Sequence, residues 1–389
     1  MRRMCSGRIV ALGACTLAAG CGSLGVQSGP QAAGIPSQVV PAGKYAVLHS
    51  FGSSGDGLQP YAKLAASNGK LYGTTQAGGA YGLGTVFEIT TSGSEKLLYS
   101  FSGSDGSQPY GSLLNVNGVL YGSTAGGGKN GAGTVFSLTA AGIEKVIYSF
   151  DTTHGSTPTG GLIRSGSEFY GTTQTGGAKN GGTVFAVSAS GKERVLHSFG
   201  GGNDGVLPHG DVIDVKGELY GTTIQGGSTG NGSVFAVSTS GKERVVYSFR
   251  DQGDGQFPEA GLLDVSGKLY GTTSASGVGG GGTVFYVTTS GKEHTILQFQ
   301  GAGDGGTPYC ALAFYKGAFY GTTGSGGYRG YGTVFAVTPT GKQTVLHKFG
   351  MGNDGQTPYA GLVFLNGKFY GTTIAGGASG GGTVFSITP

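Results

Sequence analysis

The sequence predicts an all-β protein: a seven-bladed β-propeller with four antiparallel strands per blade, closed by an N-terminal strand that completes the last blade. The first observation behind this prediction is a repeat. The segment Tyr-Gly-Thr-Thr, once Tyr-Gly-Ser-Thr, begins at Tyr72, Tyr121, Tyr170, Tyr220, Tyr270, Tyr320 and Tyr370. Seven units spaced by 49 or 50 residues are typical of repeat folds, in which each unit buries its apolar face against its neighbours.

The second observation is that each unit contains four short strand-like runs, as the fourth unit shows. Its expected strands are residues 211–215, 218–223, 233–238 and 243–249. Two-residue turns that contain Gly217 and Gly241 favour hairpins. A Gly-rich loop, 224–232, joins the second and third strands, and a long loop with an Asp-Gly pair and a Pro follows the fourth. A β-solenoid fits this pattern less well, because its coils are usually shorter than these units.

The third observation concerns the two ends of the repeat region. The last unit stops after its third strand, 382–388. Residues 44–51 have the pattern of a fourth strand without a preceding three, and they match residues 342–349 in type and place. We therefore expect residues 44–51 to pair with the third strand of the last unit. Such pairing closes the ring and covers a sheet edge that would otherwise invite aggregation.

The composition suits short strands joined by Gly-rich turns, and it excludes several classes of function. Gly accounts for 85 of the 389 residues, about three times the usual share, but it does not fall at every third position, which excludes collagen. The formal charge of +4 includes Arg2, Arg3 and Arg8; without these three, 21 of the 24 basic side chains remain against 20 acidic ones. A near-neutral chain predicts neither nucleic acid nor an anionic membrane surface as a partner.

The N-terminus is predicted to direct export and lipid attachment. Residues 1–8 are basic, and residues 9–20 form an apolar run that is too short to span a bilayer, as in a signal peptide. The run leads into Leu-Ala-Ala-Gly-Cys21, which resembles the lipobox of bacterial lipoproteins, where the cysteine thiol takes a diacylglycerol. A plain signal peptide cut near the same place is the alternative. We expect a signal peptide at 1–20, a flexible tether at 21–43 that begins with lipidated Cys21, and the propeller at 44–389.

The repeated sequence as a whole resembles one protein family. Over residues 44–389 it runs Leu-Tyr-Gly-Thr-Thr, Gly-Gly, Gly-Thr-Val-Phe, Leu-His-Ser-Phe and Asp-Gly-x-x-x-Pro. This resembles the GloVer tandem-repeat family of bacterial exported proteins, whose members carry a choice of surface anchors. The resemblance implies a secreted or surface-attached protein of the bacterial cell envelope. The lipobox would then be its anchor, at the outer membrane or the cell surface. The resemblance implies no reaction and no catalytic residues.

The units differ most informatively at the position after the repeat Pro. The residues there are Tyr61, Tyr110, Thr159, His209, Glu259, Tyr309 and Tyr359. They lie just before each inner strand, on the face that carries all the long loops, and function commonly resides on loops held by a rigid scaffold. Four tyrosines on adjacent blades beside His209 and Glu259 predict a site for a carbohydrate or a protein ligand. The alternative is that each tyrosine packs against its Pro.

An Asp recurs 16 residues before the repeat Tyr in six units. These residues are Asp56, Asp105, Asp204, Asp254, Asp304 and Asp354, and the remaining unit has His154 there. We expect the carboxylates to accept backbone N–H bonds in Asp-Gly turns. The alternative is a ring of ion sites, but one carboxylate per loop falls short of the six or more oxygens that calcium takes. We expect the repeat Tyr, and the Phe of Gly-Thr-Val-Phe, to pack between blades.

The sequence carries no catalytic signature, so we predict no catalytic residues, no metal and no cofactor. His49, His197 and His347 replace Tyr at one outer-strand position, and this spacing does not indicate a metal triad. Cys310 stands where the other units have Ala or Gly, and is expected to be a small buried residue.

These observations favour a monomeric, non-enzymatic binding scaffold. Two alternatives are an enzyme that acts on polysaccharide and a structural surface or adhesion component. Asp214 and Asp264 occupy equivalent places in adjacent inner strands. They are the carboxylate pair to check for the enzymatic alternative, which weakens if the carboxyl groups lie far beyond the separation of about 5–9.5 Å used in glycoside hydrolysis.

Overall fold

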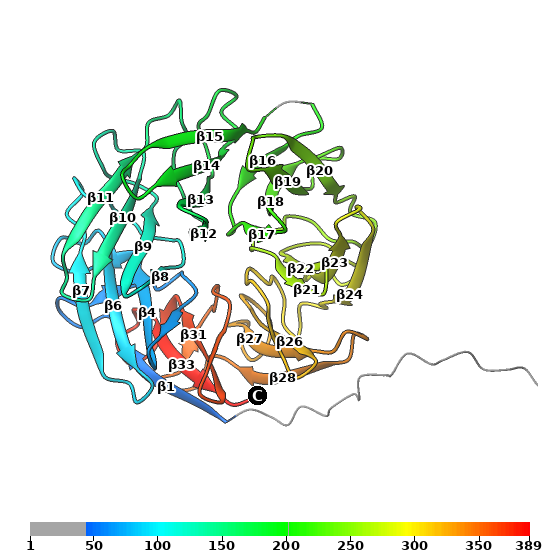
Figure 1. Ribbon diagram of the computed structural model, residues 1–389. Helices are drawn as coiled ribbons and strands as arrows, with labels where there is room; N and C mark the ends of the chain where they lie inside the picture. Colours follow the sequence, from blue (N-terminus) through cyan, green and yellow to red (C-terminus); the bar gives the residue numbers. More distant parts are fainter. Residues whose placement is uncertain (1–43, 201) are drawn as a thin grey trace, which may run out of the picture. The chain divides into compact units, whose positions relative to one another are not determined.

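The computed structural model describes residues 44–200 and 202–389. This part of the chain forms β-strands in seven antiparallel sheets around a common axis, which confirms the predicted seven-bladed β-propeller (Figure 1). The predicted signal peptide, Cys21 and the predicted tether lie outside the described residues. Within the described residues, no helix has the length and apolar character needed to cross a membrane.

Each blade has four strands, counted here from the axis outwards. Blades 1 and 2 comprise β3 (Ala65–Ser67), β4 (Lys70–Thr75), β6 (Thr85–Thr90) and β7 (Glu95–Ser100), then β8 (Leu114–Val116), β9 (Val119–Thr124), β10 (Thr134–Thr139) and β11 (Glu144–Ser149). Blades 3 and 4 comprise β12 (Ile163–Ser165), β13 (Glu168–Thr173), β14 (Thr183–Ser188) and β15 (Glu193–Ser198), then β17 (Ile213–Val215), β18 (Glu218–Gly226), β19 (Ser233–Ser238) and β20 (Glu243–Ser248).

The remaining three blades follow the same order. Blades 5 and 6 comprise β21 (Leu263–Val265), β22 (Lys268–Thr273), β23 (Thr283–Thr288) and β24 (Glu293–Gln298), then β25 (Ala313–Tyr315), β26 (Ala318–Thr323), β27 (Thr333–Val337) and β28 (Gln343–Lys348). Blade 7 combines β30 (Val363–Leu365), β31 (Lys368–Thr373) and β33 (Thr383–Ile387) with β1 (Tyr45–Ser50) from the other end of the repeat region.

The first and last described strands meet in blade 7, as predicted. β1 pairs antiparallel with β33, with Tyr45 opposite Ile387, and the two strands lie side by side in Figure 1. Phe51, which follows β1, packs edge-on against Phe87 of blade 1, with ring centroids 5.0 Å apart. The N-terminal strand therefore completes its own blade and also contributes to the contact between the last blade and the first.

The hydrophobic core lies between neighbouring blades. Seven clusters of buried residues each draw side chains from two adjacent blades. In each cluster a Phe that follows an outer strand meets a third-strand Phe of the next blade edge to face, at centroid distances of 4.9–5.3 Å, an arrangement that aromatic pairs prefer. The pairs are Phe51–Phe87, Phe101–Phe136, Phe150–Phe185, Phe199–Phe235, Phe249–Phe285, Phe299–Phe335 and Phe349–Phe385. The repeat Tyr also packs between blades; for example, the ring centroids of Tyr270 and Phe319 are 4.2 Å apart.

The hydroxyl residue that follows Tyr-Gly in the repeat segment joins the blade to the next one in six of the seven units. Thr222 Oγ1 donates to the carbonyl oxygen of Ala260 in blade 5 at 2.9 Å. The equivalent bond closes the ring from Thr372 to the Ala62 carbonyl at 3.4 Å. A hydroxyl makes this bond in six units, whereas the Thr74 hydroxyl is buried without a partner in the described part of the chain. We call these hydrogen bonds the interblade latch.

The two long loops of each unit brace each other. β16 (Gly205–Pro208) pairs with the end of β18, β2 (Gly57–Leu58) with β5 (Ala77–Gly78), and β29 (Gly355–Gln356) with β32 (Ala375–Gly376). Single bridges do the same in the other units. The Gly of the Asp-Gly pair permits the close approach, because a Cβ on Gly205 would lie 2.3 Å from Thr223 Oγ1. The long-loop face is thus a braced surface.

The first strand of blade 4 is shorter than the sequence predicts. β17 begins at Ile213, two residues later than expected. The carboxylate of Asp211 accepts the backbone N–H of Gly161 in blade 3 at 2.5 Å. This segment therefore bonds to the neighbouring blade before it enters its own sheet.

Candidate functional site

The residue before the repeat Pro directs the chain towards the axis. In all seven units it has a φ between 54° and 60° although it is not Gly, a left-handed conformation that is strained for such residues. These residues are Gln59, Gln108, Thr157, Leu207, Phe257, Thr307 and Thr357. The conformation lets the backbone N–H reach the preceding blade, as where Thr307 donates to the Gly281 carbonyl at 2.7 Å.

The Pro that follows lies against a Gly of the preceding blade. A Cβ on Gly282 would lie 2.9 Å from Cδ of Pro308, so the Gly of Gly-Thr-Val-Phe makes room for the proline ring. The same contact recurs at the ring closure, between Gly382 and Pro60. The strained residue and the anchored Pro together place the next residue of each blade beside the axis.

The structure gathers all seven of these next residues around one cavity on the axis. We call them the rim: Tyr61, Tyr110, Thr159, His209, Glu259, Tyr309 and Tyr359. They lie at the start of the inner strands, on the long-loop face. The cavity has a volume of about 90 Å³, well below the roughly 300–1,000 Å³ of pockets that enclose a whole small molecule. A ligand would therefore contact the rim from outside and insert at most a small group.

Four tyrosines form a continuous aromatic arc along one part of the rim. Tyr309 and Tyr359 stack at 4.3 Å with an interplanar angle of 9°. Tyr61 contacts Tyr359 at 5.3 Å and Tyr110 at 5.0 Å, so the arc crosses the ring closure. All four side chains are partly exposed. The tyrosines therefore pack on one another while each keeps part of its surface accessible.

The other part of the rim is polar and is held by bonds from one blade to the next. Thr159 Oγ1 donates to the His209 carbonyl at 3.2 Å, and His209 Nδ1 donates to the Glu259 carbonyl at 3.3 Å. The Glu259 carboxylate accepts the Ser274 hydroxyl at 2.9 Å. The side chains of His209 and Glu259 are thus each engaged with other partners, and they do not form an acid–base pair with each other.

Burial favours the neutral forms of the two titratable residues in this polar part. It lowers the pKa of His209, against the hydrogen bond to the Glu259 carbonyl. It raises the pKa of Glu259, against the hydrogen bond from Ser274. Removing a group from water penalises its charged form, which acts in opposite directions on an imidazole and a carboxyl. The arrangement suits an uncharged ligand.

The recurring loop Asp residues lie away from the rim and accept hydrogen bonds from turns and outer strands. Asp204 Oδ1 accepts the Gly205 N–H at 2.8 Å, and its Oδ2 lies 3.0 Å from His197 Nε2. Asp56 and Asp354 likewise bond to the N–H of the following Gly and to a His of the preceding outer strand. Asp105 and Asp254 accept a Tyr hydroxyl in place of the imidazole. Asp304 accepts the Gln300 N–H at 3.0 Å, and His154 bonds instead to Asp151.

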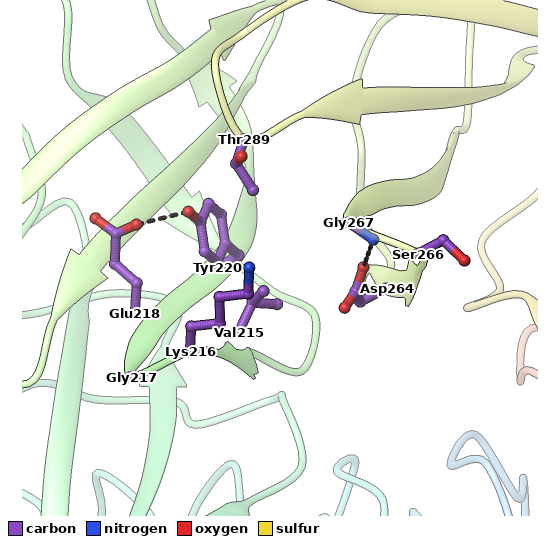
Figure 2. Close-up of a pocket in the computed structure, with 9 residues that line it drawn as sticks. All are labelled: Val215, Lys216, Gly217, Glu218, Tyr220, Asp264, Ser266, Gly267 and Thr289. Atoms are coloured by element: carbon purple, nitrogen blue, oxygen red, sulfur yellow. Dashed lines mark hydrogen bonds between the residues drawn. The ribbon is translucent and has the colours of Figure 1, made fainter.

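Asp214 and Asp264, the pair that an enzymatic role would need, each cap a tight turn on the opposite face. Asp264 Oδ1 accepts the Gly267 N–H at 2.9 Å, as Figure 2 shows, and Asp214 Oδ1 accepts the Gly217 N–H at 2.8 Å. Asn115 makes the same bond to Gly118 at 3.0 Å. Because a neutral amide performs this task equally, the two carboxylates are turn residues.

An open hollow of about 610 Å³ lies between these two turns (Figure 2). Lys216 and Ser266 line it from the turns, and Glu218 and Tyr220 from β18. The Tyr220 hydroxyl donates to the Glu218 carboxylate at 2.5 Å, and that carboxylate also pairs with Arg244 at 3.0 Å. The carboxylate on this wall is therefore already paired.

Sequence patterns missed the polar contacts of three kinds of residue. The latch Thr and the strained residue before Pro bond to a neighbouring blade, and the outer-strand residue bonds to the loop Asp that follows it. One signal was present in the sequence: the outer-strand position is His or Tyr in every unit except one, which has Leu297. That restriction to side chains with a polar tip indicates a shared hydrogen-bond partner.

The family of the protein follows from its repeats. A family model described as the Gloeobacter/Verrucomicrobia repeat matches residues 23–235 and 207–389. The chain belongs to this family. The GloVer resemblance seen in the repeated sequence is thereby confirmed, and the family is associated with exported bacterial proteins. No curated protein matches the chain.

Solved structures share the fold of this GloVer protein at low sequence identity. A putative 6-phosphogluconolactonase from Bacteroides uniformis has a TM-score of 0.50 at 14% identity, over 78% of this chain and 89% of that one. A mutant puromycin hydrolase in complex with PGG has a TM-score of 0.51 at 12% identity, and the match covers 81% of this chain but 50% of the hydrolase. A protein of unknown function from Bacteroides thetaiotaomicron has a TM-score of 0.48 at 12% identity, over 89% of this chain and 76% of that one. At these identities the likeness to the first two structures extends to the fold alone.

Proposed function

We propose that this GloVer protein is a lipid-anchored, exported binding scaffold without enzymatic activity, and that its ligand binds at the rim. The observation that carries the proposal is the aromatic arc, in which Tyr309, Tyr359, Tyr61 and Tyr110 touch in series around the axis. Repeat packing accounts for a residue that recurs in every unit. The arc belongs instead to a position that varies between units, so it calls for another explanation.

The chemistry of the rim favours a carbohydrate. Partly exposed tyrosine rings offer apolar surface for the C–H side of a sugar ring, and tyrosine hydroxyls offer hydrogen bonds at its edge. Burial keeps His209 and Glu259 towards their neutral forms, which suits an uncharged glycan. The small cavity and the open rim suit one terminal sugar that docks from outside.

The anchor rests on the N-terminal sequence. The lipobox-like run before Cys21 would attach the mature chain to a membrane through acyl chains, each buried methylene contributing about 0.8 kcal/mol. The braced long-loop face would then present the rim to envelope or extracellular glycans. A protein ligand is the competing partner, and the experiment separates the two.

A glycan array tests the proposal with three versions of the protein. We expect the purified protein to bind a subset of glycans, and Tyr359→Ala to weaken that binding at least ~tenfold, because Tyr359 contacts arc residues on both sides and central aromatic anchors dominate binding energy. Tyr81→Ala is the control, since Tyr81 is an exposed tyrosine that does not line the cavity.

Three results would contradict the proposal. If no glycan binds but a protein from the envelope binds and Tyr359→Ala abolishes that complex, the rim is a protein-binding site. If Tyr81→Ala and Tyr359→Ala weaken binding equally, the rim is not the site. Hydrolysis of an arrayed glycan by the protein would refute the non-enzymatic assignment.

A further inference from the structure

Two equivalent places between blades bring together one His, one Asp and one Glu. His197 of β15, Asp204 of the following loop and Glu243 of β20 each offer one ligand atom, and these atoms lie within 4.8 Å of one another. His49, Asp56 and Glu95 form the second group in the same way. Each group draws its His from one blade and its Glu from the outer strand of the next, so it exists only in the assembled ring.

We propose that these two groups are binding sites for a divalent transition-metal ion such as Zn²⁺, one ion at each. Neutral imidazole nitrogen and carboxylate oxygen are ligands that zinc takes at about 2.0–2.2 Å. Three protein ligands with a water in the fourth position satisfy a tetrahedral ion. Calcium needs six or more oxygens, which these groups do not supply.

The arrangement of each group already resembles that of a metal site. His197 Nε2 and Asp204 Oδ2 are 3.0 Å apart, close to the roughly 3.3 Å between two ligands of a tetrahedral ion with such bond lengths. The other Asp204 oxygen accepts the Gly205 N–H at 2.8 Å, and outer hydrogen bonds of this kind orient a metal ligand. An ion would replace the proton on Nε2.

In the group of His197, but not in that of His49, the third ligand has a buried oxygen that lacks a hydrogen-bond partner. Glu243 Oε1 has no such partner within the described part of the chain, and the same holds for Glu144 and Glu193 at two of the equivalent positions. A buried oxygen without a partner is costly, and a bound metal ion or an ordered water can supply the missing interaction. His197 and Asp204 remain partly exposed, at 17% and 10% of their side-chain surface, so an ion has access from the perimeter.

The other five equivalent positions differ in ways that provide internal controls. His347 and Asp354 have Tyr45 in place of the Glu, and its ring stacks on His347 at 3.7 Å. A Tyr occupies the His position next to Asp105 and Asp254. The full sets at these five positions are Tyr99–Asp105–Glu144, Tyr148–His154–Glu193, Tyr247–Asp254–Glu293, Leu297–Asp304–Gln343 and His347–Asp354–Tyr45. Among the seven positions, only those of His49 and His197 therefore combine a His with both carboxylates.

Calorimetric titration of the metal-stripped full-length protein with Zn²⁺ tests the proposal. We expect two ions per chain, one after His197→Tyr, and none after the double change His49→Tyr with His197→Tyr. Tyr is the residue that the chain itself places at the equivalent position in blade 4, where Tyr247 bonds to Asp254 at 2.7 Å, so these variants should retain the fold. Substituting Co²⁺ should give the visible absorption of a tetrahedral site in the parent and not in the double variant.

Two further variants guard against other causes of lost binding. His347→Tyr is the matched control and should leave two ions per chain. Glu243→Gln should remove one ion while keeping the hydrogen bond between His197 and Asp204, and Gln343 shows that Gln is accepted at this place. The proposal is overturned if the parent binds no Zn²⁺. It is equally overturned if the double variant still binds two ions, or if His347→Tyr lowers the count as much as His197→Tyr does.

Discussion

At the scale of single residues, the blades are joined by polar bonds that hold a specific geometry within an apolar interface. The latch hydroxyls reach carbonyls 37 or 38 residues further along the chain in five units. In five units the loop Asp ties the outer strand to the loop that follows it. Buried polar groups of this kind contribute little when bonded but are costly when left without a partner.

The latch predicts different effects for two chemically identical substitutions. Thr222→Val should destabilise the fold by about 1–3 kcal/mol, because it leaves the buried Ala260 carbonyl without this donor. Thr74→Val should be neutral or slightly stabilising, because the Thr74 hydroxyl is buried without a partner among the described residues and Val is of similar size. Denaturant unfolding of both variants measures the difference. Equal losses at the two positions would show that the latch bond contributes nothing.

The outer-strand Glu residues predict a pH dependence. Burial first, and then the charge of Asp105, raises the pKa of Glu144 to about 7. Burial also raises the pKa of Glu293 to about 7, supported by Asp254 and opposed by the bond from Thr295. At pH values between the ordinary Glu pKa of 4.5 and about 7, the folded protein holds protons that the unfolded chain releases. These two groups therefore make stability fall as the pH rises through that range.

Glu144→Gln combined with Glu293→Gln should remove this effect. At a pH near the ordinary Glu pKa, we expect the double variant to have the same melting temperature as the parent. At alkaline pH we expect it to have the higher melting temperature, because the parent then carries two poorly solvated carboxylates. Gln already stands at the equivalent place in blade 6, where Gln343 donates to the Asp304 carbonyl at 2.8 Å. Thermal melts of both proteins across this pH range measure the difference. A gain in melting temperature of the same size at every pH would rule out the titration of these groups as its cause.

At the scale of secondary-structure elements, β1 contributes more to the stability of the ring than its length suggests. It covers the edge of β33, and the Phe51 that follows it is fully buried between blades 7 and 1. The other six outer strands are held by a hairpin to their own blade. β1 has no such covalent neighbour, so the ring depends on its non-covalent pairing.

Truncation on either side of β1 separates its role from that of the residues before it. A chain that begins at Gly52 should melt far below a chain that begins at Lys44, or should aggregate through the exposed edge of β33. Each buried apolar side chain lost contributes roughly 1.5–3 kcal/mol, against the total of about 5–15 kcal/mol that a typical domain has. Thermal melts and size-exclusion chromatography measure both effects. Equal melting of the two chains would contradict the closure of the ring by β1.

At the scale of the whole molecule, the fold produces two faces of different character. Tight hairpin turns form one face, and braced long loops with the rim at their centre form the other. The proposed ligand site is on the face formed by the braced long loops.

Attachment through Cys21 is tested by cell fractionation. Cys21→Ala should move the protein from the membrane fraction to the soluble fraction, because it removes the acylation site that the lipobox-like run offers. Cys310→Ala is the matched control, since that thiol is buried in the propeller and should leave the fractionation unchanged. Membrane retention of Cys21→Ala, with no lipid detected on the parent, would contradict lipid anchoring.

The sequence by itself determined the features that repeat along the chain. The spacing of the Tyr-Gly-Thr-Thr segments predicts seven blades, the Gly turns predict the hairpins, and the unmatched strand at 44–51 predicts the closure by β1. It also marked the rim positions, since a difference between otherwise similar units is visible in the sequence. These features depend on strand periodicity and turn chemistry, which act between residues close in sequence.

Only the tertiary structure decided which residues of neighbouring blades meet. The stacking of Tyr309 on Tyr359, the bonds along the polar part of the rim, the interblade latch and the approach of Glu243 to His197 each bring together residues from two units. Such contacts depend on the tilt of one sheet against the next and on the left-handed turn before each Pro. Both are set by the packing of the closed ring, so they cannot be derived from the sequence of a single unit.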